Sequence, residues 1–324
     1  MTTIAAYLSH RSCKPAMLFF ALALTLPGIR PAAAVSGQRS FATAEEAVQA
    51  LAAAIKTKDT KALLAVLGKE AQPLISSGDP VADAKVGDHF LRSYEETHSL
   101  VQSADGKTVL QVGNDNWPFP IPLVESANAW RFDAAAGKEE ILDRRIGANE
   151  RSAIQVCLAY VDAQREYYQR NPEHAALLHY AQKLASSPGK RDGLFWESKA
   201  NEEESPLGPH FARARAEGYA AKGKGDPYHG YYVHILTAQG PAAAGGAYSY
   251  VAHGAMIGGF ALVAYPAKWD NSGVMTFIVN QDGVVFQKDL GPNTAQTARA
   301  IKIFNPDDTW KRVEPAPTTA AGVH

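Results

Sequence analysis

The spacing of apolar residues changes along this chain, and this change most constrains the fold. Between Phe41 and about Leu100, apolar residues recur three and four positions apart, which is the spacing of one helix face. From residue 230 onward, apolar runs of strand length alternate with turn residues. Hydrophobic residues make up 46% of the chain and charged residues 20%, so it can bury a core. We therefore predict an α+β fold.

The first part of the chain is predicted to hold three helices and then strands. Asp59 is a good N-cap for the second helix, and Gly68 is its stop. The third helix is expected from Val81 to about Thr97. Strands are expected at Thr108–Val112, Ala129–Phe132 and Glu139–Ile146. The segment NWPFPIPLV has three prolines, which exclude a central strand and predict an extended edge or a loop.

A second unit is expected to begin near Ala148. Its first element is an amphipathic helix that ends near Arg170, and an irregular stretch rich in Gly, Pro and charge follows at about 185–228. The strands expected after it are GYYVHILT, IGGFALVAYP, GVMTFIVN and GVVFQKDL, with the turn NQDG between the last two. We predict an α+β domain at 35–147, one helix packed on an antiparallel sheet at 148–315, and a flexible tail at 316–324.

The first 34 residues have the three-part pattern of a secretory leader. Arg11 and Lys14 precede the apolar run PAMLFFALALTLPGI, and Ala32–Ala34 supplies small residues for cleavage. The alternative is an N-terminal membrane anchor, but the run is short for a span and the alanines follow it directly. We expect a cleaved signal peptide, a periplasmic or secreted protein, and no transmembrane anchor after cleavage.

Charge and cysteine content limit what the exported chain can bind. The chain has 32 basic and 33 acidic residues, and loss of Arg11, Lys14 and Arg30 with the leader leaves 29 and 33, a formal charge of −4. Without a basic stripe, nucleic acid is not expected as a partner. Cys13 lies in the leader, so Cys157 alone remains and an intramolecular disulfide is excluded. Because Cys157 lies on an apolar helix face, we interpret it as a core residue and not as a nucleophile.

The sequence lacks the motifs of the common catalytic classes. It has no G-x-S-x-G, no G-x-x-x-x-G-K-[ST], no H-E-x-x-H and no C-x-x-C. His174 and His179 are five positions apart, as are His229 and His234, so neither pair shares one face of a helix or strand. The sequence therefore assigns no catalytic residue and favours a non-enzymatic role.

One loop combines rigid turn residues with bulky aromatic residues. The segment RDGLFW contains Arg191, Asp192, Phe195 and Trp196, and an exposed Trp beside Arg and Asp is suited to grip a ligand or a partner. The alternative is a loop pinned by burial of Leu194, Phe195 and Trp196. These candidates are the first residues to test for binding.

Oxygen-bearing side chains in the C-terminal turns form a weaker candidate site. Asp270, Asn271, Asp282 and Asp289 fall in or near the terminal loops, and Ca²⁺ prefers oxygen ligands of this kind. Asn and Asp also occur in turns for a local reason, since they tolerate left-handed backbone and bond their own main chain. Both interpretations remain open, and no other cofactor is expected.

Several unusual segments together resemble one bacterial family, the exported proteins of domain-of-unknown-function family 2950. The segments that carry the resemblance are NWPFPIPLV, RRIGANE, AYVDAQREYY, GKRDGLFW, ESPLGP, QGPAAAGGAYSY, MIGGFALVAYP and SGVMTFIVNQDGVVFQKDLG. They run through nearly the whole chain after the leader. The resemblance implies export and brings no catalytic residues, because the family has no established activity.

Two looser resemblances concern the fold alone. The helices from Phe41 to Thr97, with the strands that end at RRIG, resemble the cone of nuclear-transport-factor-2-like proteins, which serves as an enzyme pocket or a binding scaffold. The helix that starts at NE and the closing strands resemble the globular domain of type IV pilins and pseudopilins. A pilin polymerises through an apolar N-terminal helix, however, whereas this helix follows another domain and bears charges.

Two functions follow as hypotheses. The first is a non-enzymatic envelope protein that binds a periplasmic protein or a cell-wall component through the pilin-like domain and its aromatic loops. The second is a small-ligand-binding protein or a hydrolase with a pocket in the N-terminal domain. Trp117, Phe119 and Trp130 would line that pocket, and Asp115 or Asp133 would supply its polarity.

Overall fold

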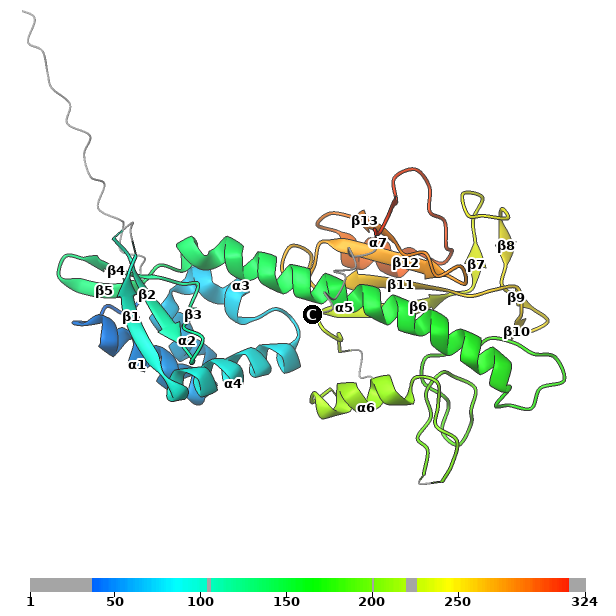
Figure 1. The fold of residues 1–324 in the computed structure, drawn as a ribbon. Coiled ribbons are helices and arrows are strands. Elements are labelled where there is room, and N and C mark those ends of the chain that lie inside the picture. Colours follow the sequence, from blue (N-terminus) through cyan, green and yellow to red (C-terminus); the bar gives the residue numbers. More distant parts are fainter. Residues whose placement is uncertain (1–36, 104–105, 200, 220–225, 315–324) are drawn as a thin grey trace, which may run out of the picture. The chain divides into compact units, whose positions relative to one another are not determined.

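Helices and antiparallel sheets make up the fold, which confirms the predicted α+β class (Figure 1). The computed structural model describes residues 37–103, 106–199, 201–219 and 226–314. The predicted signal peptide, Cys13 within it, and the predicted tail 316–324 lie outside these residues. Within the described ranges, no helix combines the length and the apolar character needed to cross a bilayer.

The N-terminal part packs its helices on a five-stranded antiparallel sheet. The helices are α1 (Ala44–Lys56), α2 (Thr60–Leu67), α3 (Gln72–Ile75) and α4 (Pro80–Glu96), with a 3₁₀ turn at Lys69–Ala71. The strands run in the order β1 (His98–Gln102), β2 (Thr108–Val112), β4 (Leu123–Ser126) and β5 (Ala129–Phe132), with β3 (Trp117–Pro118) paired to β2. Leu51, Leu110, Leu123 and Phe132 are at the centre of the core between the helices and the sheet.

Local signals account for these boundaries. The side chain of Asp59 accepts hydrogen bonds from the first turn of α2, and Gly68 ends that helix, both as predicted. The proline-rich segment forms the short edge strand β3 and then leads to Leu123, where β4 begins, so the expected edge position is confirmed.

The helix α5 (Ala134–Arg170) corrects two predictions. The strand expected at Glu139–Ile146 is wrong, because these residues belong to α5, and the helix expected to begin near Ala148 starts 14 residues earlier. Asp133 accepts a hydrogen bond from the backbone of Ala136 and so caps the helix. An ion pair between Glu140 and Arg144, one turn apart, supports the helical conformation locally. The predicted domain boundary at 147/148 falls inside this continuous helix.

The C-terminal part is built on a second five-stranded antiparallel sheet. Its strand order is β14 (Lys311–Arg312), β13 (Phe286–Asp289), β12 (Met275–Asn280), β11 (Ala261–Pro266) and β6 (Tyr231–Leu236). Short hairpin strands lie beside it: β7 (Ala238–Gln239), β8 (Tyr248–Ser249), β9 (Val251–Ala252) and β10 (Ala255–Met256). The predicted NQDG turn is confirmed by a hydrogen bond from the Gly283 N–H to the Asn280 carbonyl. Figure 1 shows α5 lying across the face formed by β11 and β12, and α7 (Thr294–Ala300) contacts β11.

Residues 185–228 were expected to be irregular, and in the described part of this stretch, 185–199, 201–219 and 226–228, the chain forms one helix, α6 (Gly208–Ala216). A contact near each end of α6 defines its direction relative to α5. Near its start, Arg170 at the end of α5 donates a hydrogen bond to the carbonyl of Glu204. Beyond its end, Gly230 lies close enough to Asn149 that an added Cβ would stand 2.6 Å from the Asn149 Nδ2. The helix α6 therefore runs antiparallel to α5.

Candidate functional site

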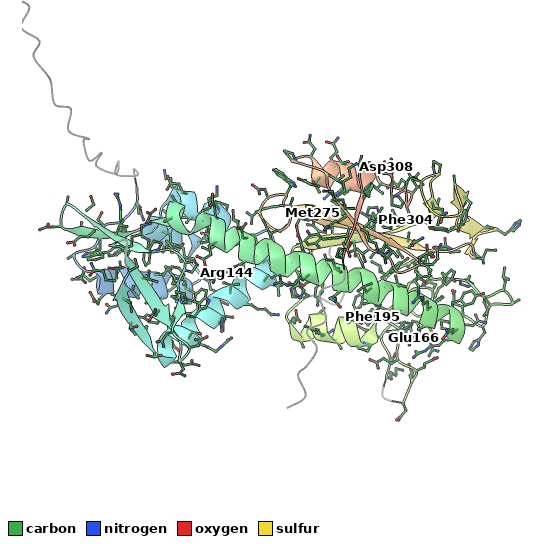
Figure 2. The ribbon with its side chains drawn as sticks, turned by 45° about the horizontal axis from the view of Figure 1, so that its top comes forward. Arg144, Glu166, Phe195, Met275, Phe304 and Asp308 are labelled. Carbon is green, nitrogen blue, oxygen red and sulfur yellow. The ribbon has the colours of Figure 1, made fainter. Side chains whose placement is uncertain are left out.

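A long groove runs along one side of α5. Its volume is about 1030 Å³, and its walls come from α5, α6, the segment 226–230 and the outer strand β6. In Figure 2, Glu166 lies near the C-terminal end of α5, and Phe195 lies beside α6. A cavity of this size is at the upper end of the range for ligand pockets in proteins.

The helix α5 contributes one regular stripe to the groove. Twelve α5 residues line the groove. Nine of them form a stripe whose members recur at intervals of three or four positions: Ala148, Arg151, Ser152, Gln155, Val156, Ala159, Asp162, Ala163 and Glu166. At 1.5 Å per residue the stripe is about 27 Å long. Five of the nine are Ala, Ser or Val, so the helix backbone lies close to the floor of the groove. The charged members are placed toward the two ends.

The opposite wall is apolar and aromatic. Phe211 of α6 lines the groove and stacks on Phe195, with ring centroids 4.0 Å apart and planes within 5° of parallel. Tyr228, half-buried in the segment 226–230, also lines the groove. From the sheet, Tyr231 and Val233 of β6 face the groove. Aromatic side chains of this kind supply large contact areas at low cost in conformational entropy.

The loop predicted to bind a partner supports this wall from behind. Trp196 is 8% exposed and donates a hydrogen bond of 3.3 Å from Nε1 to the carbonyl of Glu203. The guanidinium of Arg191 lies 5.4 Å from the Trp196 ring centroid. The expectation of an exposed Trp is therefore wrong, and the alternative of a loop pinned by burial describes Trp196 and Leu194. Phe195 reaches the groove only through its stack on Phe211.

Polar residues close one end of the groove. The Asp79 carboxylate, 1% exposed, accepts hydrogen bonds from the Tyr219 hydroxyl at 2.7 Å and from the Gly230 N–H at 3.0 Å. Burial and this bond to Asp79 raise the pKa of Tyr219. Gly230 has a φ of +73° and no room for a side chain between Asn149 and Ser272, so a glycine is needed to bring its N–H to Asp79.

A second carboxylate at this end gathers three basic groups. Glu217 lies 3.0 Å from Nε2 of His229, 3.2 Å from Nζ of Lys85 and 3.1 Å from Nε of Arg213. Burial acts to raise the pKa of Glu217, but the bonds from Lys85 and Arg213 and the charge of His229 outweigh it, so the pKa is lowered. The carboxylate thus stays ionised and ties α6 to α4.

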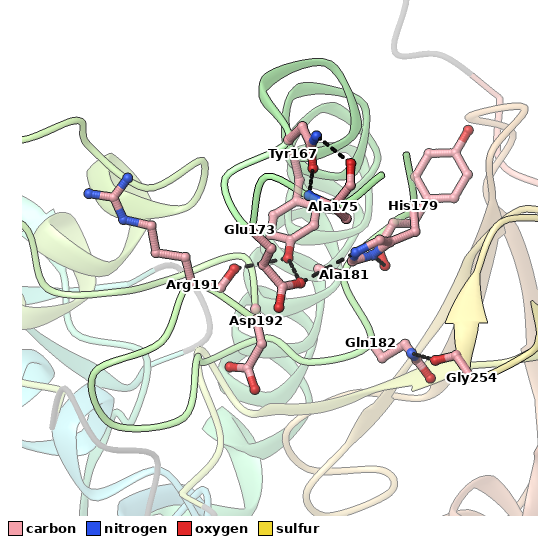
Figure 3. A network of polar contacts seen from close by, with 12 residues as sticks. Tyr167, Glu173, Ala175, His179, Ala181, Gln182, Arg191, Asp192 and Gly254 are labelled. Atoms are coloured by element: carbon pink, nitrogen blue, oxygen red, sulfur yellow. Dashed lines mark hydrogen bonds and ion pairs between the residues drawn. The ribbon is translucent and has the colours of Figure 1, made fainter. Parts of the chain in front are cut away.

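A polar network at the C-terminal end of α5 reaches the backbone carbonyl of Arg191, and Asp192 is the next residue along the chain (Figure 3). The Tyr167 hydroxyl donates to Glu173 at 2.6 Å and lies 2.9 Å from the Arg191 carbonyl. Asp192 accepts hydrogen bonds of 2.7 Å from both Nζ of Lys183 and the backbone N–H of Ser187. Burial acts to raise the pKa of Asp192, and these bonds outweigh it and lower the pKa to about 2. Asp192 is thereby engaged within its own loop.

The aromatic residues predicted to line an N-terminal pocket are not gathered around one. Trp117 is 38% exposed on the edge strand β3, with the Arg144 guanidinium 5.8 Å from its ring centroid. Phe119 packs on Phe90 in the core, and Trp130 of β5 is half-buried. The N-terminal cavity, of about 330 Å³, is lined by other residues: Glu45, Val48, Gln49, Tyr94, His98, Ser99 and Leu100.

The two carboxylates proposed for that pocket have other surroundings. Asp133 caps α5, and Asp115 is exposed in the turn before β3. In the N-terminal part, burial raises the pKa of the Asp83 side chain. Its carboxylate oxygens accept hydrogen bonds from the Ser77 N–H. Asp83 lines neither cavity described here, so its bonds hold the turn before α4.

The four calcium candidates are spread over both ends of β12. Asp270 and Asn271 precede the strand, whereas Asp282 follows it. Asn271 lies 2.6 Å from a nitrogen of Arg145, and Asp289 accepts a hydrogen bond of 2.8 Å from Nε1 of Trp269. Among the described residues, no three His, Cys, Asp or Glu side chains are arranged to hold a metal ion.

The remaining candidates lie in different surroundings. Cys157 is fully buried, and burial raises its pKa to about 12, so the thiol is a core group. His234 lies 3.0 Å from the carbonyl of Ile301, and burial lowers its pKa. His229, which the spacing separates from His234, belongs to the cluster around Glu217.

The groove itself is not predictable from the sequence pattern. The α5 stripe contains enough polar residues to resemble a solvent-facing helix surface in the sequence. The apolar residues of α6 do not follow a strong helical periodicity. The one available signal was the aromatic run DPYHGYYV, residues 226–233, which places Tyr228, Tyr231 and Val233 at the groove.

Comparisons with known proteins give one family. A family model described as a protein of unknown function (DUF2950) matches residues 38–313. No curated protein matches the chain. No solved structure matches it either.

Proposed function

Because the chain belongs to DUF2950, a family of proteins of unknown function, we propose its function from its own geometry. The protein is a non-enzymatic binding module that takes up a segment of another cell-envelope protein in the groove between α5 and α6. The envelope enters the proposal through the leader-like pattern of the first 34 residues.

The groove is the observation that carries this proposal. It combines a cavity of about 1030 Å³ with a stripe of nine α5 residues and an aromatic far wall. A stripe of about 27 Å is longer than most small ligands and has the length of a protein segment. Phe211 and Tyr228 offer the aromatic anchors that dominate the energetics of many protein interfaces.

The polar groups near the groove favour binding over catalysis. Asp79 accepts hydrogen bonds from the Tyr219 hydroxyl and from backbone N–H groups, and Glu217 is held in ion pairs with Lys85, His229 and Arg213. A general base needs a free lone pair within reach of a substrate proton. These two carboxylates instead fix the shape of the groove, as a preformed binding site requires.

The test is photo-crosslinking in living cells with benzoylphenylalanine placed at Phe211. An exposed control position away from the groove is Val101, which is 43% exposed on β1. We expect a discrete protein adduct from position 211 and none from 101. Filling the groove with Ala159→Trp abolishes the adduct without lowering the melting temperature, because the new side chain enters empty space. Equal adducts from both positions, or an adduct that survives Ala159→Trp, contradict the proposal.

A further inference from the structure

The sheet under the groove is only partly covered by helix. The helix α5 packs on β11 and β12, while Tyr231 and Val233 of the outer strand β6 face the groove beside it. Val233 packs against the main core, but its side chain is only half-buried. The groove therefore has the position that a second helix, packed beside α5 on the same sheet face, would occupy.

The stripe on α5 has the form of a helix-packing surface. Its members recur every three or four residues, which produces the ridges and grooves through which helices interlock. Small residues, such as Ala148, Ser152, Ala159 and Ala163, allow a partner backbone to approach closely. The stripe covers about 27 Å, the length of a helix of about 18 residues.

The apolar walls also select the conformation of an occupant. The side chains of Val156, Phe211 and Val233 offer no hydrogen-bond partners to a main chain lying between them. An extended segment would bury unpaired N–H and C=O groups there, whereas an α-helix pairs these groups internally. A helix is therefore the form in which a protein segment enters this groove at least cost.

The charged lining residues differ between the two ends. Arg151 of α5 and Arg213 and Arg215 of α6 lie toward the end closed by Asp79 and His229, where Asp226 is the exposed carboxylate. Glu217 and Glu197, which pair with Arg213 and Arg215, do not line the groove. Asp162 and Glu166 lie at the other end, and their partners Arg165 and Arg170 also lie outside it.

We propose that the groove binds an amphipathic α-helix of a partner protein, with acidic residues at the Arg151 end and basic residues at the Asp162 end. This inference rests on the proposed function and names the partner's form. The apolar face of the partner helix packs on the α5 stripe, Phe211 and Val233, and completes a two-helix layer on the sheet.

The test uses the purified protein and three fluorescent 18-residue peptides, followed by anisotropy. Peptide one is a lactam-stapled amphipathic Leu/Ala helix with Glu in one terminal turn and Lys in the other. Peptide two has Lys in both terminal turns. Peptide three has the composition of peptide one with two central prolines and no staple, so it is not helical.

We expect peptide one to bind about fivefold more tightly than peptide two, and peptide three to bind at least tenfold more weakly. Arg151→Glu reverses the preference between peptides one and two, because it replaces a cation by an anion at one end. Ala159→Trp abolishes binding of all three. Arg92→Glu on α4, which does not line the groove, is the matched charge control and leaves the preference unchanged.

Three outcomes overturn the inference: no binding of peptide one, equal binding of peptide three, or a preference that Arg151→Glu does not change. The crosslinking experiment separates these failures from failure of the proposed function. If position 211 still gives an adduct that Ala159→Trp abolishes, the groove binds protein in another conformation. If that adduct is also absent, both proposals fall.

Discussion

Tyr219 donates a hydrogen bond of 2.7 Å to Oδ2 of Asp79, a residue 140 positions earlier in the chain. The other carboxylate oxygen of Asp79 accepts bonds from the N–H groups of Val81 and Ala82 and so caps α4. One buried carboxylate thus begins a helix and fastens the segment after α6. The closed end of the groove depends on this single residue, since the Gly230 N–H also reaches it.

Tyr219→Phe is expected to lower the free energy of unfolding by about 1–2 kcal/mol, because a hydrogen bond to a buried carboxylate is lost. The Gly230 N–H remains as a partner of Asp79, so the loss stays below that of an unpaired buried charge. Urea denaturation at pH 7 measures it. Tyr232→Phe, whose hydroxyl is not part of this network, should change stability by less than about 0.5 kcal/mol. Equal losses in both variants would show that the Asp79 bond contributes nothing specific.

Two glycines of α5 should respond to alanine with opposite signs. A Cβ at Gly137 would lie 2.4 Å from the carbonyl oxygen of Pro120, which is backbone and has little freedom to move. We expect Gly137→Ala to cost about 2 kcal/mol or more. At Gly147 the nearest atom is Nη1 of the flexible Arg151 side chain at 3.4 Å, so Gly147→Ala should stabilise by about 0.5–1 kcal/mol. Thermal unfolding followed by circular dichroism compares them, and a gain in both variants would contradict the close approach to Pro120.

Cys157 should be unreactive in the folded protein. Its side chain is fully buried, and a pKa of about 12 leaves almost no thiolate at neutral pH. A chromogenic disulfide reagent at pH 8 is expected to label less than about a tenth of the protein in an hour and all of it in 6 M guanidinium chloride. Rapid labelling without denaturant would mean that the core around α5 opens easily.

Most of the fold was predictable because its signals are local. Asp59 and Gly68 bound α2, and NQDG closes the last hairpin, since caps and tight turns depend on a few adjacent residues. The segment Glu139–Ile146 was mispredicted as a strand because its apolar residues suit either structure over a short window. The segment is helical because it continues α5, which begins at the cap formed by Asp133 and is held by the packing of Gly137 on Pro120.

The candidate site was less predictable, because it is made by residues distant in sequence. Asp79, Tyr219 and His229 meet only after α4 and α6 are brought together, and no spacing rule reports such a meeting. Trp196 was predicted as an exposed anchor on composition, but its burial depends on the contacts of Leu194 and Leu207 around it. The sequence therefore singled out a loop that packs behind the groove wall, but it predicted an exposed Trp196 where the structure buries this side chain.

Asp192 gives a prediction in acid. Its pKa, about 2, lies below the ordinary value of 3.8, so its bonds to Lys183 and Ser187 stabilise the fold fully above pH 3.8. That stabilisation is lost as the pH falls from 3.8 towards 2, because the carboxylate is protonated. Asp192→Asn should therefore cost about 1–2 kcal/mol at pH 6, a figure reduced for the solvent screening of the half-exposed Lys183.

Guanidinium denaturation at pH 6, 4 and 2.5 measures this difference between the parent protein and Asp192→Asn. The difference should persist at pH 4 and shrink by at least half at pH 2.5. Asp162→Asn is the matched control, because Asp162 forms only a 3.7 Å ion pair with Arg165 and its side chain is 79% exposed. That variant should differ from the parent by less than about 0.5 kcal/mol at every pH. A cost for Asp192→Asn that is the same at pH 6 and pH 2.5 would mean that loop packing, and not the charge of Asp192, holds residues 183–192 in place.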